Sequence, residues 1–581
     1  MGEPLSFVAE LQRRRVFRAL IGYAVAAFAV LQIIEPVMHG LHWPDAVLSY
    51  VVVAVALGFP IVVTLAWIFD VKAGRIERTP LTDGLTGARL RLLLVGIGAV
   101  AAAPGLIYYF VVRERPASHA AGVPTPSIAA LPLVNLSHDP EQDYFADGLA
   151  EELINMMAKV PGLHVAGRTS SFAFKGKNED LRSIGQKLNV ATVLEGSVQK
   201  AGDRIRITMQ LINAADGYHL WSESYDRKLT DVFAVQDEIA GAVVTALKPK
   251  LLQGQAPTSV QHRTANPEVY TQYLLGRHFF NRATVDGYRL ASRAYEKAIA
   301  LDPDFAPAWA GLAHATYWIA DSAESVQEIF EGQRHALVAA EKAVSLGPNL
   351  AEAYVARGAI RSATRWDWEG AKADFERALA LSPESADVLR DYSLYVLRPL
   401  GKLQEGIAAS RKAAALDPLN GRTWTTVGSS LIGAGRLDEA REALNRSLEI
   451  NPEQAFAPGW LGIALLLQSQ PQAALAIAQR STSDVFRLMV TALAQHDLGQ
   501  VKESQQALDT LISRFGHSGA YQIAVVYAWW GRNDQAFEWL DRAHKQGDGG
   551  LTLVKVDAML RKVRGDPRYS ALLTRMRLPL D

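Results

Sequence analysis

Apolar residues recur at helical spacing through the second half of the chain, and one short phrase closes each helical stretch. The phrase is Ala-Leu-Asp-Pro at Pro303 and Pro418, Ala-Leu-Ser-Pro at Pro383 and Glu-Ile-Asn-Pro at Pro452. The intervals from Pro383 to Pro418 and from Pro418 to Pro452 are 35 and 34 residues. Because proline lacks an amide hydrogen and cannot continue a helix, each phrase predicts a helix end. This period predicts stacked helix pairs, each burying its apolar face against the next pair.

The unit that begins at Trp424 shows how the positions are filled. Trp424 is expected to pack between helices, while the small residues Gly428 and Ala440 lie where two helices cross closely. The same frame places other structural positions at Trp309, Pro348, Gly358 and Phe375. The unit between Pro303 and Pro348 is 45 residues long, so it contains either an insertion or longer helices.

These positions resemble the tetratricopeptide repeat family over residues 269–545, in about eight units. The resemblance implies an all-α, right-handed solenoid. Such a solenoid is expected to bind a protein or peptide partner and not to act as an enzyme. Residues 546–581 are expected to form C-terminal capping helices. The partner-binding surface is expected on the concave face, where the candidate residues are Leu389, Ser393, Val396, Thr425, Ser429 and Ile432.

Three long apolar stretches precede this region, at residues 19–41, 47–69 and 92–112. A lipid bilayer requires about 20 apolar residues per helix, so each stretch predicts a transmembrane helix. Gly98 and Ala102 form a small-x-x-x-small pair, which favours helix packing and a homo-oligomer through these helices.

Positive charges set the expected orientation of these helices. Arginines are concentrated in residues 1–18 and in the loop between the second and third stretches, whereas the loop from Glu35 to Asp45 has no lysine or arginine. Because positive loops stay inside, the amino terminus is expected in the cytoplasm. Residues beyond about 116 are then expected in the periplasm, and the protein in a bacterial inner membrane.

Between linkers at 113–126 and 251–268, residues 127–250 predict a small α/β module. The periodicity indicates strands near 127–134 and 163–166, a helix at 145–160 and another helix near 180–188. Three further strands follow, with turns at Gly202 and Gly217, before a closing helix at about 231–247. The expected element order is β-α-β-α-β-β-β-α.

Several strings in this module resemble the periplasmic module related to the TolB amino-terminal domain. They include Tyr144-Phe-Ala-Asp-Gly-Leu149, Gly167-Arg-Thr-Ser-Ser-Phe172 and Leu220-Trp-Ser-Glu-Ser-Tyr-Asp226. In that family the module stands directly before tetratricopeptide repeats, as it does here. Relatives carry a nucleotide-cyclase or winged-helix domain in front, and a subset carries membrane helices. The resemblance therefore implies an architecture and leaves the ligand open.

Charge and motif content give no support for nucleic-acid binding or catalysis. The chain has 60 basic and 60 acidic residues, and residues 126–250 have 13 basic and 16 acidic ones. An acidic run from Asp139 to Glu152 could hold a metal, but it is interpreted as favourable charge at a helix start. Lys177 lacks the glycine and hydroxyl residue of a phosphate loop. No enzyme activity, cofactor or metal is predicted.

Two hypotheses for function follow from this sequence. The first is a non-enzymatic, membrane-anchored scaffold whose tetratricopeptide solenoid binds a protein or peptide. The alternative is a membrane signal transducer in which the α/β module senses a ligand and passes the signal to a cytoplasmic partner.

Overall fold

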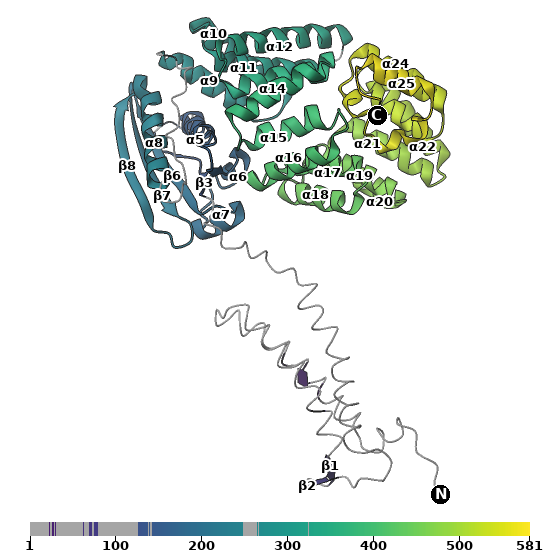
Figure 1. The fold of residues 1–581 in the computed structure, drawn as a ribbon, viewed down its shortest axis with the longest axis horizontal. Helices are drawn as coiled ribbons and strands as arrows, with labels where there is room; N and C mark the ends of the chain where they lie inside the picture. The colour runs from purple at the N-terminus through teal and green to yellow at the C-terminus, as the bar shows by residue number, and fades with distance from the viewer. Residues whose placement is uncertain are drawn as a thin grey trace. The chain divides into compact units, whose positions relative to one another are not determined.

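The computed structural model describes most of the chain after residue 125. The described residues are 126–247, except 138, 140 and 141, and 264–580, except 265 and 324. Before residue 126 they are Tyr23, Ala26, Ala27, Val30, Val62 and the antiparallel strands β1 (Phe69–Lys72) and β2 (Arg75–Arg78). The chain divides into two compact units, Met1–Gly122 and Val123–Asp581, and the second unit holds both the α/β module and the helical repeats (Figure 1).

The predicted membrane helices require a correction. Among the described residues, no helix combines the length and the apolar character needed to cross a membrane. The longest, α12 (Val326–Leu346), has 21 residues but carries charges such as Glu328 and Lys342, and the apolar α8 (Val232–Leu247) has only 16 residues. The predicted multi-pass inner-membrane protein, with its cytoplasmic amino terminus and periplasmic remainder, is therefore not upheld.

The three predicted spans themselves, 19–41, 47–69 and 92–112, lie almost wholly outside the described residues. Phe69, the last residue of the second predicted span, is in strand β1 rather than in a helix. The predicted homo-oligomer through Gly98 and Ala102 also falls outside the described part of the chain.

The α/β module is built on one mixed sheet with the strand order β5-β3-β6-β7-β8. Its strands are β3 (Ser127–Ala130), β5 (His164–Val165), β6 (Thr192–Ala201), β7 (Arg204–Asn213) and β8 (His219–Lys228). β5, β3 and β6 are parallel, and β6, β7 and β8 form an antiparallel meander; the short β4 (Val134–Asn135) also pairs with β6. Helices α5 (Asp143–Met157) and α8 cover one face of the sheet (Figure 1).

Alternation along the strands divides the core of the module between the two faces. Ile128 and Leu194 pack with α5 and α8, whereas their neighbours Ala129 and Val193 pack with α7 (Leu181–Leu188) on the other face. The predicted α/β module is thus confirmed, with two additions: β4 and the short helix α6 (Arg168–Phe172). Pro132 accounts for the break between β3 and β4, since proline cannot donate to a ladder.

The remaining described chain folds into eight successive helix pairs. The pairs are α9 (Pro267–Phe280) with α10 (Val285–Leu301), α11 (Ala306–Asp321) with α12, α13 (Ala351–Ile360) with α14 (Trp368–Leu381), α15 (Ala386–Tyr392) with α16 (Leu403–Leu416), α17 (Gly421–Gly433) with α18 (Leu437–Ile450), α19 (Ala457–Leu467) with α20 (Pro471–Ala478), α21 (Asp484–Asp497) with α22 (Val501–Phe515), and α23 (Ala520–Trp529) with α24 (Asn533–Gln546). Single π-helical turns extend α13 and α15. We call the side lined by the first helix of each pair the inner face.

The repeated phrase ends one helix, and its proline carbonyl can accept a hydrogen bond from the next helix. Helices α10, α12, α14, α16 and α18 each end two residues before a proline. Trp309 Nε1 donates to the carbonyl of Pro303 at 2.8 Å, and Trp424 Nε1 donates to that of Pro418 at 2.9 Å. In these two units the tryptophan of the frame therefore ties the first helix to the preceding turn.

The packing of the pairs explains two other features of the sequence. The long unit between Pro303 and Pro348 contains the long helices α11 and α12.

A Cβ atom on Gly428 would lie 2.5 Å from Leu444 Cγ, and one on Gly358 would lie 3.0 Å from Phe375 Cδ2. Those glycines let paired helices approach closely, and Ala440 is fully buried at the same crossing.

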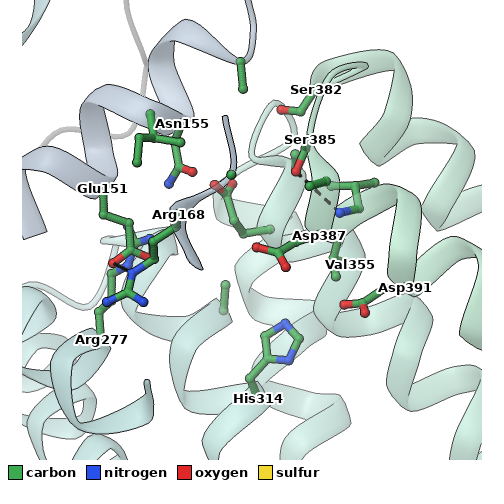
Figure 2. Close-up of a pocket in the computed structure, with 18 of the residues that line it drawn as sticks. Glu151, Asn155, Arg168, Arg277, His314, Val355, Ser382, Ser385, Asp387 and Asp391 are labelled. Atoms are coloured by element: carbon green, nitrogen blue, oxygen red, sulfur yellow. Dashed lines mark hydrogen bonds and ion pairs between the residues drawn. The ribbon is translucent and has the colours of Figure 1, made fainter. Parts of the chain in front are cut away.

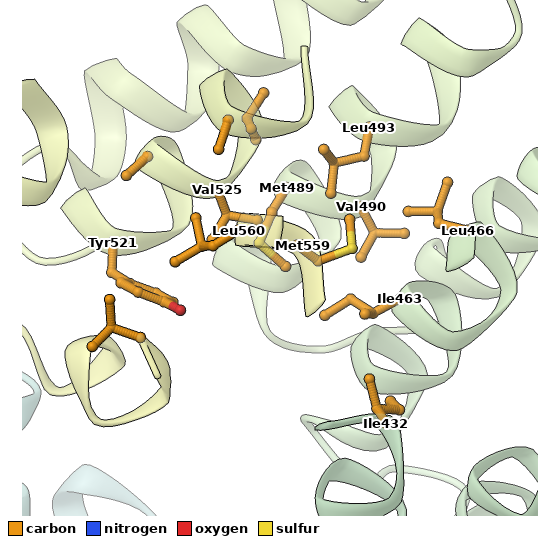
Figure 3. Packing of buried hydrophobic residues seen from close by; sticks show 14 of the residues in the cluster. Ile432, Ile463, Leu466, Met489, Val490, Leu493, Tyr521, Val525, Met559 and Leu560 are labelled. Atoms are coloured by element: carbon orange, nitrogen blue, oxygen red, sulfur yellow. The ribbon is translucent and has the colours of Figure 1, made fainter. Parts of the chain in front are cut away.

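The C-terminal segment turns back into the repeats. It contains the 3-10 helices η7 (Gly549–Leu553) and η8 (Ala558–Val563) and the helix α25 (Pro567–Arg575). Met559 and Leu560 of η8 pack among Ile463, Val490 and Val525 (Figure 3). Trp368 Nε1 donates to the carbonyl of Met576 at 2.7 Å. The end of the chain therefore contacts the third helix pair as well as the last.

Candidate functional site

The six residues predicted to bind a partner are all buried. Ser393 Oγ donates to the Gly406 carbonyl, and Ser429 Oγ accepts from Arg398, so both hydroxyls are used inside the array. Thr425 Oγ1 lies 2.9 Å from Ser447 Oγ. Leu389, Val396 and Ile432 belong to apolar core clusters. All six side chains are therefore largely shielded from solvent in this structure.

The C-terminal segment fills the inner face of the later repeats. Ile463, Val490 and Val525 come from the first helices α19, α21 and α23, and they belong to the same core cluster as Met559 and Leu560 of η8 (Figure 3). Val554, Met559 and Leu560 are 1% exposed or less. Burying three such side chains stabilises the fold by roughly 1.5–3 kcal/mol each, so this segment is a fixed part of the core.

The α/β module covers the inner face of the earlier repeats. Its docking segment, residues 167–172, lies against the loop between α16 and α17. Gly167 donates its amide to the Leu416 carbonyl at 2.7 Å, and Ser170 donates its amide to Asp417 Oδ1 at 2.7 Å. Ser170 Oγ accepts from the Leu419 amide at 2.8 Å. The repeat phrase at Asp417 thus serves as a docking point for the module.

A buried ionic cluster forms a second contact between the module and the repeats. Arg277 of α9 pairs with both Glu151 and Glu152 of α5, and Arg168 Nε lies 3.0 Å from Glu151 Oε2. Burial would raise the pKa of Glu151, but Arg277 and Arg168 hold that pKa below its ordinary value. Burial raises the pKa of Glu152. Removing Arg277 would leave Glu151 with Arg168 alone and would leave Glu152 without its ion pair, which is strongly destabilising.

A cavity of about 310 Å³ lies beside this cluster, between the module and the first five helix pairs. Figure 2 shows Glu151, Arg168 and Arg277 gathered on one side, with Asp387, Asp391 and His314 on the other. The lining from the module comes from α5, β5 and α6, and the lining from the repeats comes mainly from α9, α11, α13 and α15. Its walls therefore belong to two parts of the chain.

The far wall of the cavity carries a second ionic group. Arg390 donates to Asp391 at 2.8 Å and also pairs with Asp387. Burial lowers the pKa of the nearby His314, which favours its neutral imidazole. Ser385 Oγ accepts from the Val388 amide and caps α15, which fixes the start of the helix that carries this group.

Two lining carboxylates retain an oxygen without a hydrogen bond. Glu352 Oε2 and Glu384 Oε2 are buried and have no hydrogen-bond partner among the described residues. Glu384 uses its other oxygen for Lys412, at 3.0 Å. A buried acceptor without a donor costs about 1–3 kcal/mol, so these atoms mark positions where a ligand donor would be favourable.

Sequence reasoning missed most of this site. The acidic run was interpreted as charge at a helix start, yet only Asp143 lies in the first turn of α5. Asp147 accepts from Lys175 at 2.7 Å, and Glu151 and Glu152 reach Arg277 in the repeats. The string Gly167 to Phe172 was singled out by resemblance, and it proves to be the docking segment. In the described part of the chain, no group of three or more acidic, histidine or cysteine side chains is placed to hold a metal.

Comparison with known families and proteins supports the repeats. The model of the tetratricopeptide repeat matches residues 421–454, which correspond to α17 and α18, so the chain contains tetratricopeptide repeats. A curated relative, putative adenylate cyclase 3 of Rhizobium meliloti (strain 1021), is 44% identical over 187 residues, which is 32% of this chain and 32% of that protein. The chain thus matches about a third of the length of this curated relative.

Solved structures with some likeness to the chain include tetratricopeptide proteins. PilW, a widely conserved type IV pilus biogenesis factor, is 20% identical with a TM-score of 0.31, covering 37% of this chain and 98% of its own. YrrB, a tetratricopeptide protein with an unusual peptide-binding site, is 20% identical with a TM-score of 0.25, covering 38% and 99%. A monomeric mutant of IFIT1 with Gppp-AAAA is 13% identical with a TM-score of 0.36, covering 54% and 76%. These scores are too low to support an inference about function.

Proposed function

We propose that the chain is a non-enzymatic scaffold that binds a protein or peptide partner in the cavity between the α/β module and the first five helix pairs. The observation that carries the proposal is the cavity itself, which has buried carboxylate oxygens without donors. Its volume is at the lower end of ligand pockets, which are about 300–1,000 Å³. That size suits one or two side chains of a bound segment rather than a folded domain.

The filled inner face of the later repeats supports this choice of site. Buried apolar residues of 549–563 share one core cluster with α19, α21 and α23, so a partner at that face would have to displace a buried segment. The cavity requires no such displacement, since its lining side chains already surround open space.

We also propose that the α/β module is related to the TolB amino-terminal domain. The strings at residues 144–149, 167–172 and 220–226 support the relationship, as does the position of the module before the repeats. The second of these strings forms the contact with Asp417, which gives that part of the resemblance a structural role.

A second candidate function is a signalling regulator in which the bound ligand alters the contact between the module and the repeats. The observation that favours it is that Glu151 and Arg168 both line the cavity and hold the module against Arg277. The relative named as a putative adenylate cyclase is consistent with a signalling setting. The match covers a third of that protein and therefore does not carry its activity to this chain.

The scaffold proposal can be tested by selecting peptides on the full-length protein from a random display library. A synthetic peptide from the selection would be measured by calorimetry against the wild type, Asn155→Trp and Ser222→Trp. Asn155 is half-buried and lines the cavity, whereas Ser222 is exposed on β8, away from it. We expect binding to weaken at least tenfold, about 1.4 kcal/mol, in Asn155→Trp alone. Equal binding by both variants, or a selection that yields no peptide, would refute the proposal.

A further inference from the structure

The cavity has an unusual distribution of charge. Its lining includes the carboxylates of Glu151, Glu352, Glu384, Asp387 and Asp391 and the guanidinium groups of Arg168, Arg277, Arg390 and Arg422. Three of these arginines are already committed to carboxylates, because Arg168 and Arg277 pair with Glu151, and Arg390 pairs with Asp387 and Asp391. The carboxylate of Glu352 remains outside these pairs.

Glu352 lies where a positive charge would be stabilised. Its Oε2 atom is buried without a hydrogen-bond partner among the described residues. Two groups that interact with it carry no positive charge: Glu152 is acidic, and burial favours the neutral form of His314. A charge-assisted hydrogen bond contributes about 1.5–3 kcal/mol, which is more than a neutral donor would contribute at the same place.

Aromatic side chains in the same cavity point to the same ligand chemistry. Tyr273, Phe280 and Tyr295 line it. Arg277 already lies over the Tyr273 ring, 5.6 Å from its centroid, which shows that this wall accepts a guanidinium. Phe280 is half-buried and offers a further ring edge or face. Cations are attracted to aromatic faces by about 0.5–2 kcal/mol, so a carboxylate beside aromatic rings favours a cationic group.

We infer that the cavity binds a cationic group of the partner, an arginine or lysine side chain or an amino-terminal amine, and that Glu352 is its acceptor. This inference rests on the proposed function, because it assumes that the cavity is the binding site. It adds the chemical class of the group that enters and the residue that selects it.

The test uses short capped peptides with the full-length protein. The probes are acetyl-Ala-X-Ala-amide with X as Arg, Lys, Gln or Glu, measured by calorimetry or ligand-observed NMR. We expect the Arg or Lys probe to bind at least tenfold more tightly than the Gln probe, and the Glu probe to bind most weakly. The uncapped peptide Ala-Gln-Ala-amide distinguishes the sources, since tight binding by this probe would assign the site to an amino-terminal amine.

Two variants connect the preference to Glu352. In Glu352→Gln the advantage of the cationic probe over the Gln probe should fall to about threefold or less. The matched control is Glu376→Gln, which removes an exposed carboxylate of α14 outside the cavity and should leave the preference unchanged. Circular dichroism would confirm that both variants are folded.

Each alternative result has a definite meaning. Equal binding of Arg, Gln and Glu probes would overturn the inference while leaving a neutral-peptide site, and hence the scaffold, in place. A preference that survives Glu352→Gln would overturn the role of Glu352. If no probe binds although peptides selected from the library do bind, the cationic class is wrong and the scaffold proposal stands.

Discussion

The carboxylate of Asp417 accepts a hydrogen bond from the backbone amide of Ser170 at 2.7 Å, although 247 positions separate them in the chain. Asp417 belongs to the phrase that ends a repeat helix, and Ser170 belongs to the α/β module. A Cβ atom on Gly167 would lie 2.4 Å from Asp417 Cγ, so the docking segment approaches as closely as its backbone permits. Asp417, a position of the repeat phrase, thus also holds the α/β module against the repeats.

We expect Asp417→Ala to loosen the docking segment. The substitution leaves the buried Ser170 amide without its acceptor, which should cost about 1–3 kcal/mol. Hydrogen exchange should accelerate in residues 167–173, and the melting temperature should fall.

The matched control for this variant is Asp302→Ala. Asp302 occupies the same position in the phrase at Pro303, but among the described residues the hydrogen bond to its carboxylate comes from the nearby Asp304 amide, at 3.2 Å. Exchange in residues 167–173 should therefore be unchanged in Asp302→Ala. If both variants behave alike at that segment, the contact with Asp417 does not hold the module in place.

Gly428 offers a test of the helix frame. We expect Gly428→Leu to destabilise the protein by about 1–3 kcal/mol, because even a Cβ atom would lie 2.5 Å from Leu444 Cγ. The control is Gly241→Leu in α8, where no atom lies within 4 Å of the added Cβ. That control should be neutral or stabilising by up to about 0.8 kcal/mol, since leucine favours helix more than glycine. Urea unfolding of both variants measures the difference, and equal midpoints would contradict the frame.

The repeats were predictable because their signals are local. The proline two residues beyond five of the second helices and the small residue at crossings such as Gly428 follow from backbone chemistry and packing inside one unit. The module was predictable for a similar reason, since Ile205, Ile207, Met209 and Leu211 alternate along β7 and all face one core. Helix α6 was missed because five residues are too few to show a helical period.

The candidate site was not predictable because it depends on contacts between distant segments. Nothing near Arg277 in the sequence indicates that Glu151 and Glu152 will face it, and a single sequence carries no pairing information. The inner-face candidates Thr425 and Ile432 lie in α17, the first helix of its pair, where the repeat frame places them. They are nevertheless buried, and Ile432 belongs to the core cluster that the C-terminal segment completes.

The contact between Trp368 and Met576 should control how firmly the chain end is held. We expect Trp368→Phe to cost about 1–3 kcal/mol, because the Met576 carbonyl loses a buried donor at 2.7 Å. Exchange in residues 567–580 should accelerate. In Trp309→Phe the lost bond is exposed and joins residues six positions apart, so exchange at the chain end should not change. Unchanged hydrogen exchange at residues 567–580 in Trp368→Phe would show that other contacts hold the chain end in place.

Asp548 predicts a specific dependence of stability on pH. Its carboxylate is buried and accepts from the amides of Tyr521 and Gly550 at 2.9 and 2.8 Å. Burial raises the pKa of Asp548 to about 6, although the two amides oppose the shift. In the unfolded chain the pKa is about 3.9. The folded protein therefore holds this proton more tightly than the unfolded chain between about pH 4 and pH 6.

The contribution of Asp548 to stability is fully present below about pH 4 and is lost as the pH rises through 6. Relative to Asp548→Asn, the wild type should lose on the order of 3 kcal/mol between pH 4 and pH 7, at about 1.4 kcal/mol for each pKa unit. Urea unfolding at intervals of one pH unit measures this difference. Asp541→Asn provides a control of opposite sign, because Arg575 and Lys545 lower the pKa of Asp541, so its contribution is lost as the pH falls. Parallel curves for the wild type and Asp548→Asn would show that the buried carboxylate does not titrate in this range.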